Sequence, residues 1–179
     1  MLRDAIIHDD PTPELRQTAT QLVMGVGSPT ATIVIIGEAP GKREDEQGVP
    51  FVGASGKLLD ELLASIHLTR DDVYITNIVK YRPPDNRDPR RDEKEAFAPY
   101  LSAQLAIIQP KIIITLGRHS MEFFLPQQRI GETHGPPHPQ GLDGWQSTLI
   151  PLYHPAAALY NGSLRQTLFT DMQMVAEAL

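Results

Sequence analysis

Polar side chains of three kinds stand at points in this sequence where apolar runs end. Glu38 follows TIVIIG, Asn77 closes VYITN, and His154 follows STLIPLY. A carboxylate can stabilise positive charge, an amide offers a donor and an acceptor, and a histidine can donate to a developing anion. Ligands of open α/β folds bind at the carboxyl ends of strands, so we expect these three to converge there. The alternatives are a turn-forming asparagine and a structural histidine.

The segment after Glu38 adds an aromatic ring and further carboxylates. Phe51 lies in GVPFVG, where prolines and glycines stiffen the backbone. A ring held in this way can serve as a stacking platform for a planar ligand, although a core phenylalanine is the alternative. Glu44, Asp45 and Glu46 lie just before it, and solvation of a loop is the interpretation we prefer for Glu46.

A phosphate-binding loop is excluded by spacing. GEAPGK has three residues between its glycines where a nucleotide-binding loop has four, and Arg43 stands where Ser or Thr would bind magnesium. Glu38 would also repel phosphate. A neutral or electron-poor ligand suits this turn better than an anion, which leaves a nucleotide hydrolase as a distant third hypothesis.

Charge restricts any contact with nucleic acid to one region. The net charge is −6, so the protein as a whole cannot hold DNA by bulk charge. One Pro-rich segment, residues 80–91, is nevertheless distinctly basic. It could bind a phosphate backbone, and the alternative is a charged loop exposed to solvent. Its cations are Lys80, Arg82, Arg87, Arg90 and Arg91. His134 and His138 are separated by two prolines that deny them a common helix face, so we expect no metal pair there.

Alternating strands and helices must position these residues. Runs rich in Ile and Val predict four buried parallel strands, at Thr32 to Gly37, Val73 to Ile78, Lys111 to Gly117 and Ser147 to Tyr153. Apolar stripes predict helices at Gly53 to Ile66, Phe97 to Ile108, Arg118 to Leu125 and Leu164 to Leu179, with a further pattern at Glu14 to Val23. Pro99 predicts a kink or a restart. The expected fold is one α/β domain over residues 1–179, a three-layer α/β/α sandwich around a central four-stranded, mostly parallel sheet.

Composition limits the chemistry and the compartment. The chain has no cysteine, which excludes disulfides, thiolate catalysis and any cysteine-ligated metal. No stretch approaches the roughly 18 apolar residues of a membrane span, and the N-terminus has no apolar core of a signal peptide. We expect a cytoplasmic monomer without contact to a membrane.

In combination, the motifs GEAPGKREDEQGVPFVGASGKLL, TNIVKYRPPDNRDP, LGRHSMEFFL and HPAAAL resemble the uracil-DNA glycosylase superfamily, and most closely its family 4 branch. The resemblance implies an enzyme that flips uracil out of DNA and hydrolyses its glycosidic bond. It implies uracil binding by Gly37, Ala39, Phe51 and Asn77, and catalysis by Glu38, Asp45 and His154. Glu38, Glu44 and Asp45 are the candidates for positioning water or stabilising the sugar cation. The implied DNA contacts are Lys80, Arg82, Arg87, Arg90, Arg91 and Ser55, with Leu159 and Tyr160 as a wedge.

The chain departs from the family pattern at several positions. Family 4 enzymes carry an iron-sulfur cluster on four cysteines, whereas here Tyr81 and Phe97 stand at two of those positions and no cofactor is expected. We predict that aromatic packing replaces the cluster. Ala39 stands where other branches hold water with Asp or Asn, and Tyr160 stands where an Arg is common. The basic segment lacks the histidine with which some relatives trap the sugar, so we expect no covalent adduct. A catalytically silent paralogue that binds uracil or damaged DNA is the alternative function.

Overall fold

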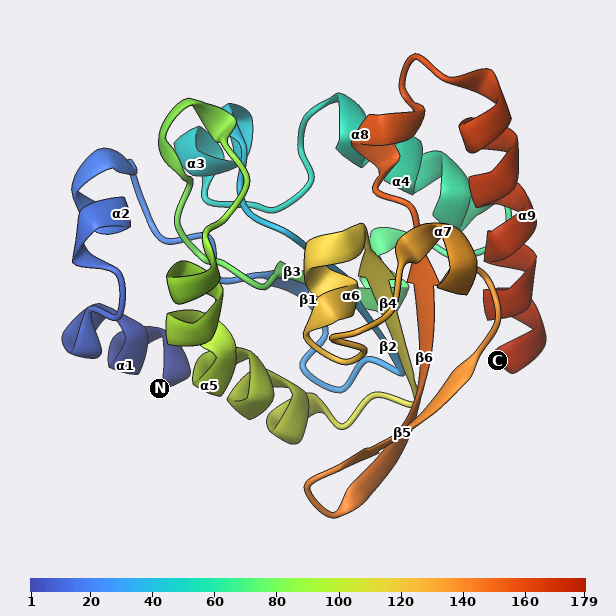
Figure 1. The fold of residues 1–179 in the computed structure, drawn as a ribbon. Coiled ribbons are helices and arrows are strands. Elements are labelled where there is room, and N and C mark those ends of the chain that lie inside the picture. The colour runs from blue at the N-terminus through green and yellow to red at the C-terminus, as the bar shows by residue number, and fades with distance from the viewer.

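The computed structural model describes residues 1–179 and places a mixed sheet between helices on both of its faces (Figure 1). The sheet has six strands in the order β1-β3-β2-β4-β6-β5. The strands are β1 (Val26–Gly27), β2 (Ile33–Gly37), β3 (Val73–Asn77), β4 (Ile112–Leu116), β5 (His138–Leu142) and β6 (Trp145–Leu152). The three-layer fold with a parallel centre is confirmed, because β3, β2, β4 and β6 pair in parallel.

The prediction of four strands was too low. β1 and β5 pair antiparallel at the two edges of the sheet. β1 has only two residues, and β5 reads HPQGL with both Pro and Gly, a composition that is depleted in strands except at sheet edges. Neither strand carries the apolar run that identifies a buried strand.

The central strands are buried on both faces, as their unbroken apolar runs predict. All five residues of β2 are buried, and Ile35 lies opposite Ile75 of β3 and Ile114 of β4. Alternate side chains of β2 enter two separate cores. Ile33 and Ile35 pack with α4 (Ala54–Ala64) and α9 (Gly162–Ala178), whereas Val34 and Ile36 pack with α5 (Arg91–Ile108).

The remaining helices are short and lie mostly outside the predicted set. They are α1 (Leu2–Asp9), α2 (Pro13–Thr18), α3 (Lys42–Gln47), α6 (Arg118–Glu122), α7 (Ile130–Thr133) and α8 (Pro155–Ala158), with 3₁₀ turns at Arg70–Asp72 and Pro84–Asn86. α3 forms where the charged segment suggested a loop. None of the helices is long and apolar enough to cross a bilayer.

Pro99 was predicted to cause a kink or a restart, and α5 is one helix of 18 residues with Pro99 inside it, so the helix does not restart there. Pro99 is exposed, as is Glu95 one turn earlier. The carbonyl that loses its helical hydrogen-bond donor therefore faces solvent, where water replaces the missing partner.

Aromatic side chains occupy the place where the family resemblance implies a cluster. Tyr81 and Phe97 are buried with ring centroids 6.1 Å apart, and Phe97 meets Tyr100 edge-on at 6.3 Å. Ile6 of α1 and Leu15 of α2 belong to the same core. An iron-sulfur cluster does not fit these residues, since none of them is a thiolate. The predicted aromatic packing is confirmed, and it ties the N-terminal helices to α5.

Replacing Phe97 with Ala is expected to lower the free energy of unfolding by about 3–5 kcal/mol, because the fully buried ring leaves a cavity that α5 cannot close. Urea denaturation would measure the loss. Ile107→Ala on the same helix is the control: its side chain is 66% exposed, so its effect should stay within about 0.5 kcal/mol. Equal losses of stability in the two variants would contradict the role of Phe97 in holding the N-terminal helices to α5.

Candidate active site

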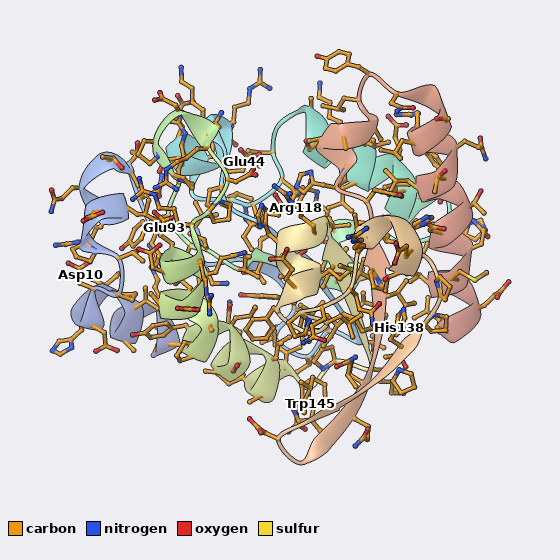
Figure 2. All side chains as sticks on the ribbon, viewed as in Figure 1. Asp10, Glu44, Glu93, Arg118, His138 and Trp145 are labelled. Carbon is orange, nitrogen blue, oxygen red and sulfur yellow. The ribbon has the colours of Figure 1, made fainter.

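A cavity of about 440 Å³ opens at the carboxyl ends of the central strands. Its lining residues come in part from α3, α8 and the loop before α5. These elements lie at the end of the molecule opposite the turn that joins β5 and β6 (Figure 1). Figure 2 shows Glu44 at this end of the molecule and Trp145 at the hairpin. The predicted site residues in its wall are Glu38, Ala39, Phe51, Ser55, Asn77, Arg87 and His154. The structure thus brings together residues from segments more than a hundred positions apart.

Gly37 does not line the cavity but lies directly behind the ring of Phe51 and the amide of Asn77. A Cβ atom at Gly37 would lie 2.4 Å from Asn77 Oδ1 and 2.6 Å from Phe51 Cζ. Such distances leave no room for a side chain, so glycine is required where these two groups approach the end of β2. Gly37 therefore contributes to the predicted uracil site by its lack of a side chain.

Phe51 is held in a strained conformation by two residues that sequence reasoning did not assign to this task. Its φ is 55°, in the left-handed region that phenylalanine rarely adopts. Glu44 Oε1 accepts hydrogen bonds from the amides of Val52 and Gly53, each at 3.0 Å. Arg70 donates to the carbonyls of Pro50, at 3.2 Å, and Phe51. These contacts fix the ring against the cavity.

His154 stacks on Phe51 and is neutral. The two ring centroids are 5.8 Å apart at 26°. Burial lowers the pKa of His154 to about 4, although Glu44 opposes the shift. Nδ1 accepts a hydrogen bond from the amide of Ala156 at 3.1 Å, in the first turn of α8. Because Nδ1 is an acceptor in this neutral ring, Nε2 carries the proton and is available as a donor.

Glu38 is a carboxylate whose surroundings push it toward the protonated form. Burial raises its pKa, while the nearby His119 opposes the shift. The His119 amide lies 3.4 Å from Glu38 Oε1, and a Cβ atom at Gly117 would lie 2.4 Å from the same oxygen. A carboxylate with a raised pKa is a stronger base than an ordinary glutamate once it is ionised.

Glu38, Asp88 and His119 are the residues that could share a metal ion, with ligand atoms within 4.8 Å of one another. Positive groups already lie against two of them. Arg118 Nη2 is 3.0 Å from Asp88 Oδ2, and Lys94 Nζ is 3.2 Å from His119 Nδ1. The negative charge of the cluster is thus compensated by the protein itself. Neither Asp88 nor His119 was singled out from the sequence.

The two C-terminal histidines weighed as a metal pair face different partners. His134 Nδ1 lies 2.6 Å from Asp171 Oδ2, and His138 Nε2 lies 3.3 Å from the carbonyl of Thr133. His134 therefore ties the segment after α7 to α9, which is a structural contact.

Asp45, predicted as a catalytic carboxylate beside Glu38, does not line the cavity. It is 3% exposed and accepts hydrogen bonds from the amides of Thr20, at 2.8 Å, and Gln21, at 3.3 Å. Its neighbour Glu44 lines the cavity instead. Because α3 is a helix, consecutive residues point about 100° apart, and only one of the pair can face the site. Asp45 anchors the N-terminal segment to α3.

Replacing Asp45 with Asn is expected to lower the free energy of unfolding by about 1–3 kcal/mol, since an amide cannot accept from both backbone groups with the same strength. Urea denaturation measures the loss, and hydrogen exchange at Thr20 and Gln21 should quicken. Glu46→Gln on the exposed side of α3 is the matched control. Unchanged exchange at these two amides would contradict the anchoring role.

Lys80, predicted as a DNA contact, is fully buried and cannot reach DNA. The other cations of its segment remain near or at the surface. Arg87 lines the cavity and pairs with Glu93 at 2.6 Å, and Arg82 Nε donates to Asn86 at 2.7 Å. Arg90 and Arg91 are exposed. The basic segment therefore keeps four of its five predicted cations at or near the surface, where Arg87 and Arg91 are paired with Glu93 and Glu95.

The predicted wedge divides into a packed and a free residue. Leu159 is partly buried and packs on the core beneath α8, whereas Tyr160 is 99% exposed.

Two exposed cations of α3, Lys42 and Arg43, lie at the same end of the molecule, and they were not predicted from the sequence. The segment does not stand out as basic in the sequence, because Glu44, Asp45 and Glu46 follow these two cations directly.

Comparison with known proteins gives consistent matches over nearly the whole chain. The model of the family described as "Uracil DNA glycosylase superfamily" matches residues 24–175. A protein of Saccharolobus solfataricus named "Type-4 uracil-DNA glycosylase" is 48% identical over 163 residues, which cover 88% of this chain and 76% of the relative. Proteins of the same name from Sulfurisphaera tokodaii and Archaeoglobus fulgidus are both 46% identical, and each alignment covers 92% of this chain with 77% and 85% of the relative.

Proposed function

We infer that this chain, which belongs to the uracil-DNA glycosylase superfamily, is a monofunctional uracil-DNA glycosylase that excises uracil in DNA repair. The observation that carries this inference is one cavity holding a ring, an amide and a neutral histidine from three segments, Phe51, Asn77 and His154. Those are the groups needed to stack on a flipped pyrimidine, to read its edge and to stabilise it as a leaving group.

Uracil is recognised by shape and by one amide. Phe51 offers the face of its ring to the flipped base, and Gly37 leaves room for the close approach of Phe51 and Asn77. The Asn77 amide can accept from the N3–H of uracil and donate to its O4. Cytosine presents the reverse pattern at these two atoms, so the same amide orientation disfavours it.

Cleavage breaks the bond between C1′ of the sugar and N1 of uracil. Its electron pair leaves with the base, and negative charge develops on uracil O2 while the sugar becomes cation-like. His154 donates from Nε2 to that oxygen without giving up its proton. Glu38 stabilises the sugar and accepts a proton from the attacking water, whose oxygen bonds to C1′. Solvent then protonates the uracil anion, and an abasic site remains.

DNA is held around the mouth of the cavity by local positive charge. Arg82, Arg87, Arg90 and Arg91 bind the phosphate backbone, Ser55 contributes at the start of α4, and Tyr160 fills the gap left by the flipped nucleotide. No histidine occurs in the segment 80–91, so turnover proceeds without a covalent adduct. We propose that the protein acts as a cytoplasmic monomer and needs no cofactor.

Release of free uracil from a duplex with one U·G pair tests the function. Abasic sites should accumulate at enzyme excess, and an identical duplex with cytosine in place of uracil should stay intact. Tight DNA binding without any release would favour a silent paralogue and contradict the proposal.

A further inference from the structure

Lys80 is a buried ammonium that the proposed reaction leaves unused. Its side chain has no exposed surface. Nζ donates to Thr76 Oγ1 at 2.7 Å, to the carbonyl of Asn77 at 2.6 Å and to Gln104 Oε1 at 2.5 Å. An ammonium has three hydrogens, and each of them has a partner here. The Lys80 ammonium is therefore buried beneath the end of β3 with all of its hydrogen-bond donors paired.

The acceptors of Lys80 connect it to the segments around this strand end. Thr76 Oγ1 donates to the carbonyl of Met24 at 2.8 Å, and Gln104 Nε2 donates to the same carbonyl at 3.1 Å. The carbonyl of Lys80 itself accepts from Val23 at 2.9 Å. The Lys80 side chain thus links β3 to α5, and Thr76, Gln104 and the Lys80 carbonyl link both to the segment that precedes β1.

The link to the active site is the peptide group between Asn77 and Ile78. Its C=O accepts from Lys80, and its N–H donates to the carbonyl of Gly37 at 3.0 Å. Both ends of this peptide are therefore held, one by the ammonium and one by β2. The plane of this peptide contains the Cα atom of Asn77, so holding the plane restricts the position from which the Asn77 side chain extends.

Stability alone gives no reason for a charge at this position. Burial lowers the pKa of Lys80 to about 7, so the site disfavours the charge that the three acceptors favour. Apolar residues of similar volume commonly replace buried charges without loss of stability. We propose that Lys80 is a positioning residue, which holds the Asn77–Ile78 peptide and thereby the uracil-reading amide in its working orientation. The proposal rests on the proposed role of Asn77.

Replacing Lys80 with Met keeps the length of the side chain and removes its donors. The single-turnover rate of uracil release and the affinity for free uracil should both fall about 10- to 100-fold, the cost of a displaced binding group. Affinity for DNA that already contains an abasic site should stay within about twofold, because Lys80 does not reach DNA. Leu105→Ala, a core change in α5, is the control for general destabilisation and should spare the rate at low temperature.

A second variant separates positioning from folding. Adding Thr76→Val to Lys80→Met removes one of the acceptors that the first change leaves unpaired, while the carbonyl of Met24 still accepts from Gln104 Nε2. The double variant should regain part of the lost stability to urea but not the rate or the uracil affinity. A rate restored together with stability, or full uracil affinity in folded Lys80→Met, would overturn the proposal. A wild-type protein that releases no uracil would instead contradict the proposed function.

Discussion

Alanine in place of His154 is expected to slow uracil release about 10²–10³-fold, the usual cost of removing one donor from a developing oxyanion. The ring stacks on Phe51 and accepts from Ala156, so its orientation is set before the substrate binds. No reorganisation is needed when charge appears on the base. Single-turnover kinetics with enzyme in excess measure the chemical step directly.

The affinity of His154→Ala for abasic DNA provides the control, because the donor acts on the departing base. A fall in that affinity as large as the fall in rate would contradict a role in the transition state. The pH profile adds an independent test. Burial lowers the pKa of His154 to about 4, so the ring stays neutral above that pH and should produce no inflection near 6.5.

Glu38→Gln is expected to lower the same rate about 10²–10⁴-fold, since glutamine keeps the shape of the side chain but cannot take a proton. Burial raises the pKa of Glu38, and only its ionised form is a base. The wild-type rate should therefore rise with pH through a pKa above the ordinary glutamate value. The variant should lack this limb of the profile.

Glu46→Gln supplies the matched control, because its carboxylate lies on α3 close in sequence but exposed to solvent. It should retain the wild-type profile. If Glu38→Gln kept the wild-type rise with pH, another group would have to activate the water. Glu44 lines the same cavity, and it would be the first to test.

Much of the sheet could be predicted because its signal is local. β2 and β4 are unbroken apolar runs, and the polar residues that end β2, β3 and β6 stand where the chain leaves the sheet. Convergence then follows from the parallel pairing of these strands. Glu38, Asn77 and His154 were identified from this pattern, and all three line the cavity.

The errors came from contacts that depend on tertiary structure. Glu44 and Asp45 are adjacent carboxylates that the sequence alone does not distinguish. Only the helical geometry of α3 directs Glu44 to the cavity and Asp45 to the amide of Thr20. Lys80 reads as one more cation of a basic segment. The acceptors that bury it come in part from Gln104, 24 residues away. His119 escaped notice because it lies 81 residues from Glu38 in the sequence, and only the tertiary structure brings the two together.

The contact between Tyr81 and Phe97 changes what the chain requires from the cell that makes it. A metal cluster at this place would have to be assembled and delivered by other proteins before the N-terminal helices could dock. Two aromatic rings are complete when translation ends. Docking of these helices thus needs no cysteine-ligated cluster, and with no thiol in the chain, oxidants have no cysteine to modify.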